Sequence, residues 1–320
     1  MFRWTLIAAF VSGLLGVGEA KRSLPLTNTG ARKVDIQRVM RQVQNGRFVA
    51  AEKTARNILA NNPSAVGVQA LLGVALVRRG KYADGLVELE QTWGVMAYTE
   101  SGGIAAHADA LRAAGRGREA WTVREARLHG MVGERERVRI YNQGMDDYLS
   151  EGRTDEAISL GWDALSIHPD APSTHAFLST AYLMSGDTDS AGFHHWMSMK
   201  NEHVRSPRAA VNDAWLGEAH NDVAGGLLAW ERVNHVRRSK ARMAAWHGGW
   251  LRRNGRVSEA RGIVFDSVWS DHQDPDLYAE QIRLLHALGE PVLAIEGLGQ
   301  LVELYPEHPY IHNLEQLLSE

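Results

Sequence analysis

The feature that most constrains this chain is a glycine that returns about every 34 residues. In the stretch LLGVALVRRGKYADGLVEL, for example, one apolar helical run ends at the glycine and a second begins after it. The glycines that follow this period are Gly46, Gly80, Gly115, Gly152, Gly186, Gly255 and Gly289. A chain that repeats on this scale folds as a stack of small units, each packed against its neighbours, without a separate central core.

The missing member of the series falls near residue 220, in the stretch AHNDVAGG. His220 stands where the glycine would be, and Asn221, which tolerates a positive φ, is expected to turn the chain instead. A small residue follows each turn by five positions: Ala51, Gly85, Ala120, Ala157, Ala191, Gly225, Ala260 and Ala294. A glycine can end a helix in the left-handed conformation, and a small residue lets two helix axes approach closely. Each repeat is therefore predicted to be a helical hairpin.

These repeats resemble those of the tetratricopeptide-repeat family. The residues that carry the resemblance are Leu72, Gly73, Leu76, Tyr82, Leu178, Tyr182 and the helix-closing prolines Pro63, Pro169 and Pro306. Two departures are visible, since the aromatic residue expected in the second helix is usually Leu, Val or Gly, and the sixth repeat lacks its turn glycine. The resemblance implies an all-α, right-handed superhelical solenoid of about eight helix hairpins whose first helices line a concave groove.

The two ends of the chain differ from the repeats. Residues 1–20 are predicted to be a signal peptide, with a basic start, an apolar run at 4–17 and small residues Gly18 and Ala20 before the cleavage site. As a helix, that run would span about 21 Å, short of the roughly 30 Å hydrocarbon core, so an uncleaved anchor is the less favoured alternative. We expect a flexible lead at 21–31, eight repeats at 32–307 and a capping helix at 308–320.

No arrangement of residues points to catalysis. The sequence has no nucleophile elbow, no zinc-protease helix and no phosphate-binding loop, and the chain contains no cysteine. His194 and His195 are adjacent, and adjacent helical residues do not face one another, so they are not expected to chelate one ion. We therefore expect no enzyme activity, no catalytic residue, no cofactor and no metal site. A net charge of −3 gives no reason to expect nucleic-acid binding.

The phase of the first helices predicts which side chains line the groove. The candidate partner-binding residues are Arg78, Asp109, Arg112, Asn142, Asp146, Arg242, Trp246, Arg252 and Arg283. Charged residues on such a face indicate a solvated or ligand-facing surface, and both interpretations remain open. The rear half is rich in arginine, which binds carboxylates in bidentate fashion, so an acidic peptide or an anionic polymer is the favoured guest.

Three tryptophans form a second candidate surface. Trp162, Trp196 and Trp230 are 34 residues apart, so they are expected to occupy one side of three successive second helices as a ladder. Packing between repeats is one interpretation, and an exposed aromatic stripe for a partner or a sugar chain is the other.

Two functions follow as hypotheses. The first is an exported scaffold or adaptor that binds protein partners through its groove during assembly of a cell-envelope complex, located in the periplasm of a Gram-negative host and otherwise secreted. The alternative is an accessory subunit of envelope polysaccharide synthesis or export that contacts polymer through the tryptophan ladder and the basic groove. Membrane contact is expected only through the signal segment or a membrane partner.

Overall fold

The computed structural model describes residues 33–96, 101–130, 132–200, 207–236, 241–266 and 271–319. These ranges contain seventeen α-helices and no strand. Successive helices pair as α2 (Lys33–Gln44) with α3 (Phe48–Asn61), α4 (Val66–Arg78) with α5 (Tyr82–Met96), α6 (Ser101–Ala113) with α7 (Gly117–Glu125), α8 (Glu134–Leu149) with α9 (Thr154–Ile167), α10 (Pro172–Ser185) with α11 (Thr188–Met199), α12 (Pro207–Ala219) with α13 (Val223–Val236), α14 (Ala241–Arg253) with α15 (Val257–Val264), and α16 (Pro275–Ala287) with α17 (Pro291–Leu304). The last helix is α18 (Tyr310–Ser319). The predicted all-α repeat solenoid is confirmed, whereas the predicted signal peptide and flexible lead lie outside the described residues.

The eight hairpin turns are the places where the backbone takes a positive φ. All seven periodic glycines have φ between 69° and 84°, and Asn221 has φ 59°. Within the described ranges no other residue has a positive φ. The prediction that Asn221 replaces the missing glycine is therefore confirmed, because Asn is among the few side chains that tolerate this conformation.

The small residue five positions after each turn lets the two helices of a hairpin approach closely. Ala51, Ala120, Ala157, Ala191, Ala260 and Ala294 are all fully buried. In the sixth repeat the prediction of Gly225 is wrong, because the turn lies at Asn221 and the equivalent position is Gly226. A Cβ on Gly226 would lie 2.5 Å from a ring carbon of Trp250, whereas Gly225 lies in the first turn of α13 and donates its N–H to Asp222 at 2.9 Å.

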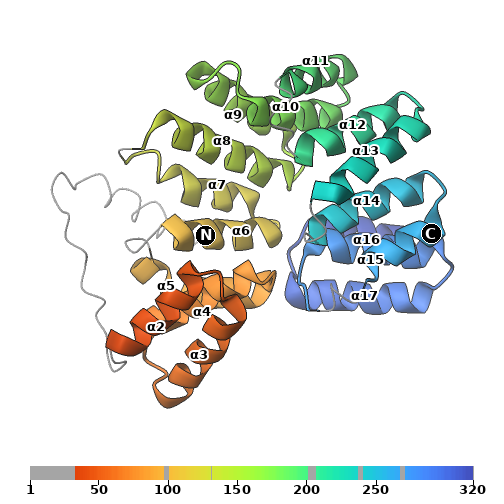
Figure 1. Ribbon diagram of the computed structural model, residues 1–320. Helices are drawn as coiled ribbons and strands as arrows, with labels where there is room; N and C mark the ends of the chain where they lie inside the picture. Colours follow the sequence, from red (N-terminus) through yellow and green to blue (C-terminus); the bar gives the residue numbers. More distant parts are fainter. Residues whose placement is uncertain are drawn as a thin grey trace, which may run out of the picture.

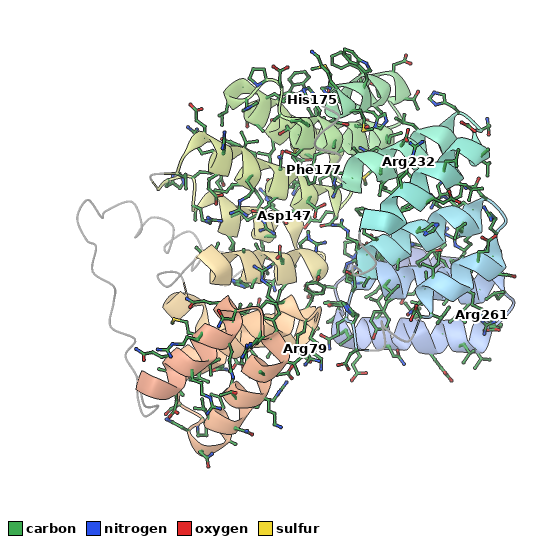
Figure 2. The ribbon with its side chains drawn as sticks, in the orientation of Figure 1. Arg79, Asp147, His175, Phe177, Arg232 and Arg261 are labelled. Atoms are coloured by element: carbon green, nitrogen blue, oxygen red, sulfur yellow. The ribbon has the colours of Figure 1, made fainter. Side chains whose placement is uncertain are left out.

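The stack curls until its two ends meet. Figure 1 shows the hairpins passing from α2 and α3 through α9, α10 and α11 and returning to α16 and α17 beside the N-terminal repeats. The N–H of Gln273 donates to the carbonyl of Gly80 at 2.9 Å, and Asp271 pairs with Arg79 at 3.2 Å and with Lys81 at 3.6 Å. Arg79 is labelled at this junction in Figure 2.

Apolar packing extends the junction along the C-terminal helices. Tyr82, Ala83 and Ala114 pack against the buried cluster built from α16, α17 and α18. A Cβ on Gly115 would lie 2.4 Å from Pro309, so the two ends are in close contact there. We call these contacts the seam: residues 79–84 and 114–115 on one side, and 271–273 and 308–311 on the other. The predicted capping helix, α18, thus covers the last hairpin and also joins the two ends of the solenoid.

Candidate binding surfaces

Three of the predicted groove residues, Arg112, Asp146 and Arg242, meet in one cluster around the carboxylate of Asp146 on α8. The guanidinium of Arg242 lies 2.8 Å from it, that of Arg112 lies 3.7 Å from it, and Arg208 pairs with it as well. Arg242 also contacts Asp276 at 2.7 Å. Asp146 and Arg242 are 96 residues apart in the sequence, so this cluster connects the fourth repeat directly to the seventh.

Burial and charge act in opposite directions on the acids of the cluster. Burial raises the pKa of Asp146, but the charges of Arg242, Arg208 and Arg112 outweigh this effect and hold that pKa well below its usual range. For Asp274, which caps α16 by accepting the N–H of Leu277, burial and the nearby charge of Asp276 raise the pKa to about 6. The cluster is thus a compensated set of arginines and carboxylates.

Aromatic rings support the arginines of this cluster. The Arg208 guanidinium lies 4.0 Å from the ring centroid of Phe177 and 5.3 Å from that of Trp246, and Arg242 lies 4.6 Å from the same Trp246 ring. Phe177 is labelled in Figure 2. Trp246 therefore packs beneath two charged groups of its own chain.

The front residues form a second chain of ion pairs. Arg78 contacts Asp109 at 3.3 Å, and the buried Arg124 contacts Asp109 and Asp147, each at 2.7 Å. Burial raises the pKa of the fully enclosed Asp147 to about 7 in spite of the Arg124 charge; this residue is labelled in Figure 2. Asn142 ties α8 to α10, since its amide donates to Ser173 and accepts from Thr174.

The rear arginines are also paired with carboxylates of the same chain. Arg252 contacts Glu280 at 2.7 Å, and Arg283 lies 3.8 Å from the same carboxylate. The charge of the predicted positive patch is consequently neutralised by carboxylates of the same chain. A carboxylate of a binding partner would have to compete with Glu280, Asp146 or Asp276 for these arginines. Binding of a partner by these residues stays a prediction.

Several members of these clusters were not predicted from the sequence: Arg208, Arg124, Asp147, Asp276, Glu280 and Tyr310. A signal existed for four of them. Arg208 and Asp276 lie 34 residues before and after Arg242, Tyr310 lies one further period on, and Glu280 lies 34 residues after Trp246. Residues one period apart take the same place on successive first helices. Tyr310, whose hydroxyl donates to Asp276, continues the same series, since it lies 34 residues after Asp276.

The predicted tryptophan ladder is wrong in its third member. Trp162 is 51% exposed and Trp196 is 59% exposed, but Trp230 is 1% exposed and stacks on His247 with ring centroids 4.6 Å apart. Trp162 and Trp196 follow their turn glycines by ten residues, whereas Trp230 follows Asn221 by nine. One residue rotates a side chain by about 100° around a helix, which carries Trp230 from the outer surface into the core.

The two exposed tryptophans belong to an aromatic patch with Phe193, which is 54% exposed. We define the aromatic patch as Trp162, Phe193 and Trp196. The first two rings rest edge-on against the buried His194 at centroid distances of 5.5 and 5.2 Å, and Phe193 lies 6.4 Å from Trp196. The patch is therefore fixed on α9 and α11 by a packed base.

A histidine pair forms that base. The Nδ1 atoms of His175 and His194 are 2.8 Å apart, and Nε2 of His175 donates to the Pro169 carbonyl at 3.0 Å. His194 must then donate to His175, because a neutral imidazole carries one proton. Burial lowers the pKa of His194 to about 4, so the pair is neutral near pH 7. In the ranges that the structure describes, no group of three or more acidic or histidine side chains could hold a metal ion, and no helix is long and apolar enough to cross a membrane.

A scan against family models found no match for the sequence, and a search of curated proteins found none either. Among solved structures, a tetratricopeptide-repeat protein from Parabacteroides merdae is 14% identical, with a TM-score of 0.48, and the match covers 90% of this chain and 98% of that one. Pseudomonas aeruginosa PilF is 13% identical, with a TM-score of 0.43, over 68% of this chain and 96% of that one. The human IFIT1 dimer with PPP-AAAA is 13% identical, with a TM-score of 0.44, over 86% of this chain and 73% of that one.

The period, the paired helices and the left-handed turns are all properties of this chain itself. Each hairpin contacts the next, with Trp250 and His247 of α14 joining the sixth and seventh, and the positive-φ turns recur at the interval read from the sequence. The chain therefore folds as an all-α repeat solenoid of helical hairpins, the architecture that the tetratricopeptide-repeat resemblance implies.

Proposed function

We propose that the protein is an exported scaffold that binds protein partners in a complex of the cell envelope. The observation that carries this function is the aromatic patch, which presents three large exposed rings on a braced helical frame. Exposed aromatic residues on rigid elements are typical centres of protein interfaces. Export is supported by the predicted signal peptide at 1–20 alone.

The aromatic patch is favoured over the groove as the contact surface. The groove arginines already have carboxylate partners, so a guest gains little there without displacing one. In the patch, the ring nitrogen of Trp162 lies 3.4 Å from the Tyr182 hydroxyl, which leaves mainly apolar ring surface for a partner. Such surface gains free energy from burial in a protein interface.

Crosslinking to envelope extract tests whether the partner binds the aromatic patch. The wild-type protein is compared with variants that are each altered on one surface only. The patch variant combines Trp162→Ala, Phe193→Ala and Trp196→Ala, and the groove variant combines Arg252→Ala and Arg283→Ala. A matched control, Leu228→Ala with Val87→Ala, removes two exposed apolar side chains from α13 and α5. We expect the patch variant alone to lose the crosslinked partner. If the patch variant keeps the crosslinked partner and the groove variant loses it, the partner binds in the groove and not on the aromatic patch.

Export is tested separately by the N-terminus of the protein recovered from the envelope fraction. Cleavage after Ala20 predicts a mature chain that begins at Lys21. Recovery of Met1 on the exported protein would contradict cleavage and favour an anchor.

One observation favours the alternative function in envelope polysaccharide synthesis or export. Trp162 and Trp196 occupy the same position in consecutive repeats, and both are exposed, so a chain of sugar rings could contact both. Migration of the protein through a gel containing envelope polysaccharide separates the two functions. Retardation that disappears with Trp162→Ala and Trp196→Ala, but persists with Leu228→Ala, would support polymer binding, and unretarded wild-type protein would contradict it.

A further inference from the structure

The aromatic patch lies in an acidic stretch of the chain. Residues 154–200, which contain its three rings, carry six acidic side chains and one basic side chain. The whole chain has a net charge of −3, so this stretch alone exceeds the negative charge of the entire protein. A partner that covers the rings therefore approaches through a negative field.

Two of these acids stand in line with the exposed tryptophans. On α9, Asp155 precedes Trp162 by seven residues, and on α11 the same interval separates Asp189 from Trp196. Seven residues come within about 20° of two full helical turns, so each acid lies on the same face as its tryptophan, about 10 Å along the helix. All four side chains are exposed. The two helices thus present the same column, with a carboxylate at the start and an indole two turns later.

A third acid has no role in stabilising its helix. Asp163 follows Trp162 on α9, four residues before that helix ends at Ile167, and its side chain is exposed. Aspartate is a weak helix former, and the helix dipole disfavours a negative charge near the C-terminal end. Asp155 and Asp189, in contrast, stand in first helical turns, where a carboxylate is stabilising. Asp163 is unfavourable for α9, so a contact outside the chain would give it a role.

These three carboxylates are not neutralised by basic side chains of the described chain. Asp155, Asp163 and Asp189, which we call the acidic rim, form no ion pair within the ranges that the structure describes. Glu156, by contrast, is held by Arg153. The groove carboxylates are likewise shared by arginines of the same chain. The charge of the acidic rim is therefore available to a partner.

The one basic side chain of this stretch shows what the rings accept. The Nζ atom of Lys200 lies 5.9 Å from the ring centroid of Trp196. A cation is attracted to the negative face of an aromatic ring, and tryptophan attracts it most strongly. Among the described residues no cation lies over Trp162. The Trp162 ring is thus open to a cation from a partner.

We propose that the aromatic patch and the acidic rim together bind a basic, apolar segment of a partner protein. Its apolar side chains cover the rings, and its lysine or arginine side chains rest on Trp162 and pair with the acidic rim. The same carboxylates repel an acidic peptide or an anionic polymer. This inference rests on the proposed function, because it names the chemistry of the partner that the aromatic patch would bind.

Two labelled peptides that differ only in charge test this assignment. One carries leucine and lysine on one helical face, and the other carries glutamate at each lysine position. Fluorescence anisotropy with the full chain at low salt should show binding of the lysine peptide and at least about tenfold weaker binding of the glutamate peptide, because like charges across an interface repel. Equal binding of the two peptides, or binding of neither, overturns the inference.

Amide variants decide whether the acidic rim provides this preference. Replacing its carboxylates should weaken binding of the lysine peptide about fivefold or more at low salt and much less at high salt, since exposed ion pairs are modest and screened. This variant combines Asp155→Asn, Asp163→Asn and Asp189→Asn. The matched control removes three exposed carboxylates of α17 and α18 that have no ion pair in the described chain: Glu296→Gln, Glu303→Gln and Glu315→Gln. Equal weakening by both variants would reduce the effect to net charge and overturn the inference.

A change at Lys200 should act in the opposite direction. Lys200→Gln removes the basic side chain over Trp196, so the lysine peptide should bind about two- to fivefold more tightly at low salt, because like charges no longer meet there. Unchanged or weaker binding would contradict a basic partner. Melting temperatures near that of the parent protein show that these variants fold.

The patch variant separates this inference from the proposed function. Trp162→Ala, Phe193→Ala and Trp196→Ala together should abolish binding of the lysine peptide. If the patch variant still binds it, the peptide binds elsewhere and the inference is wrong. If both peptides bind the parent protein equally and neither binds the patch variant, the aromatic patch remains a contact surface but its partner is not basic. The proposed function itself fails only if the patch variant keeps the crosslinked envelope partner.

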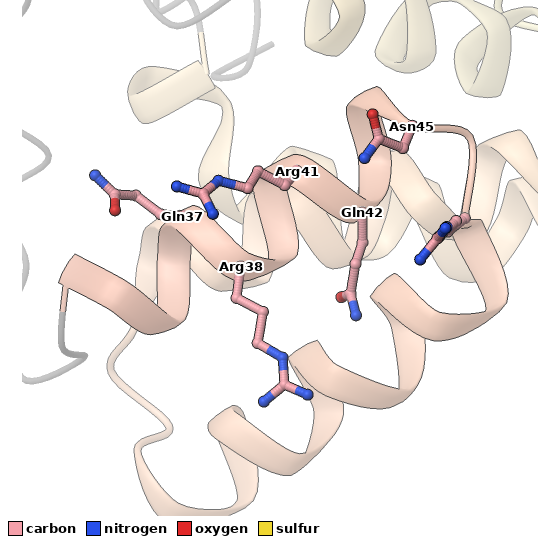
Figure 3. Close-up of a pocket in the computed structure, with 6 residues that line it drawn as sticks. Gln37, Arg38, Arg41, Gln42 and Asn45 are labelled. Carbon is pink, nitrogen blue, oxygen red and sulfur yellow. The ribbon is translucent and has the colours of Figure 1, made fainter.

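A second copy of the chain is the other basic occupant to test. Figure 3 shows Arg38 and Arg41 on α2, beside a surface hollow in the first repeat, and both side chains are exposed. Analytical ultracentrifugation of the parent protein over a range of concentrations measures whether such a surface binds the patch of another copy. A monomer at every concentration supports a separate partner. Self-association that disappears in the acidic-rim variant would assign the patch to a second copy and contradict the inference.

Discussion

At the scale of single residues, Asn221 sets the register of a whole helix. Its left-handed conformation closes α12, and every side chain of α13 is counted from it. Asn221→Ala should lower the free energy of unfolding by about 1 kcal/mol, because a Cβ without a compensating polar group is unfavourable at positive φ. Asn221→Gly should be neutral or slightly stabilising, as measured by urea denaturation. His220→Gly is the control, and a gain there without one at Asn221 would place the turn at residue 220.

Buried histidines make the protein sensitive to acid. Burial lowers the pKa values of His107, His194, His247 and His308 to about 4 in the folded chain. The unfolded chain binds these protons below about pH 6.5, so the stability contributed by each neutral histidine is complete above that pH and is lost as the pH falls toward 4. Asp147 acts in the opposite direction, because its pKa is raised to about 7.

One substitution isolates the histidine contribution from that of the acids. His247→Gln removes a single titrating group, so the loss of unfolding free energy between pH 7.5 and pH 5 should shrink by roughly 1 to 2 kcal/mol relative to the parent protein. Denaturant unfolding at the two pH values measures the difference. His312→Gln, on the exposed face of α18, is the control. An unchanged pH dependence for His247→Gln would mean that His247 titrates alike in both states.

At the scale of helices, the tryptophans separate core from surface. Trp230 is enclosed between α13 and α14, whereas Trp162 is exposed on α9. Trp230→Ala should cost about 3 to 5 kcal/mol of unfolding free energy, and Trp162→Ala should change it by about 0.5 kcal/mol or less. Chemical denaturation measures both. Equal losses would contradict the one-residue register difference between α9 and α13.

The helices and their turns were predictable because the cause of each turn is local. A glycine or an asparagine determines where positive φ is tolerated, and a small residue five positions later determines the close approach of two helices. Trp230 and Gly225 were misplaced for a related reason. When the positions of α13 are counted from His220 instead of from the true turn at Asn221, each is assigned one residue too early. That error exchanges core-facing and solvent-facing positions on the helix.

At the scale of the whole molecule, the central cluster couples repeats that are distant in sequence. Asp146→Asn would leave Arg112, Arg208 and Arg242 facing one another without their shared carboxylate. We expect a loss of about 3 to 5 kcal/mol, as for a broken buried ion pair. Small-angle scattering should show a larger radius of gyration while circular dichroism remains helical. Asp163→Asn on the exposed face of α9 is the control, and an unchanged radius for Asp146→Asn would mean that the seam alone closes the ring.

The contact between the two ends of the solenoid, and the pairing of particular arginines with particular carboxylates, could not be predicted from the sequence for a geometric reason. The curvature that brings Asp271 to Arg79 accumulates over many repeats, and a small change in each repeat moves the end of the stack by a large amount. Individual groove residues could be placed on a face by their phase. Which of them meet across the ring depends on that accumulated angle.

The seam also bears on how such a gene can change. An open solenoid can gain or lose a repeat by duplication or deletion, since each unit contacts only its neighbours. Here the turns at Gly80 and Gly115 fit against His272 and Pro309, so inserting or removing one unit between them would displace one half of this joint from the other. We therefore expect selection against recombination within the array, with the number of repeats staying fixed while their surfaces diverge.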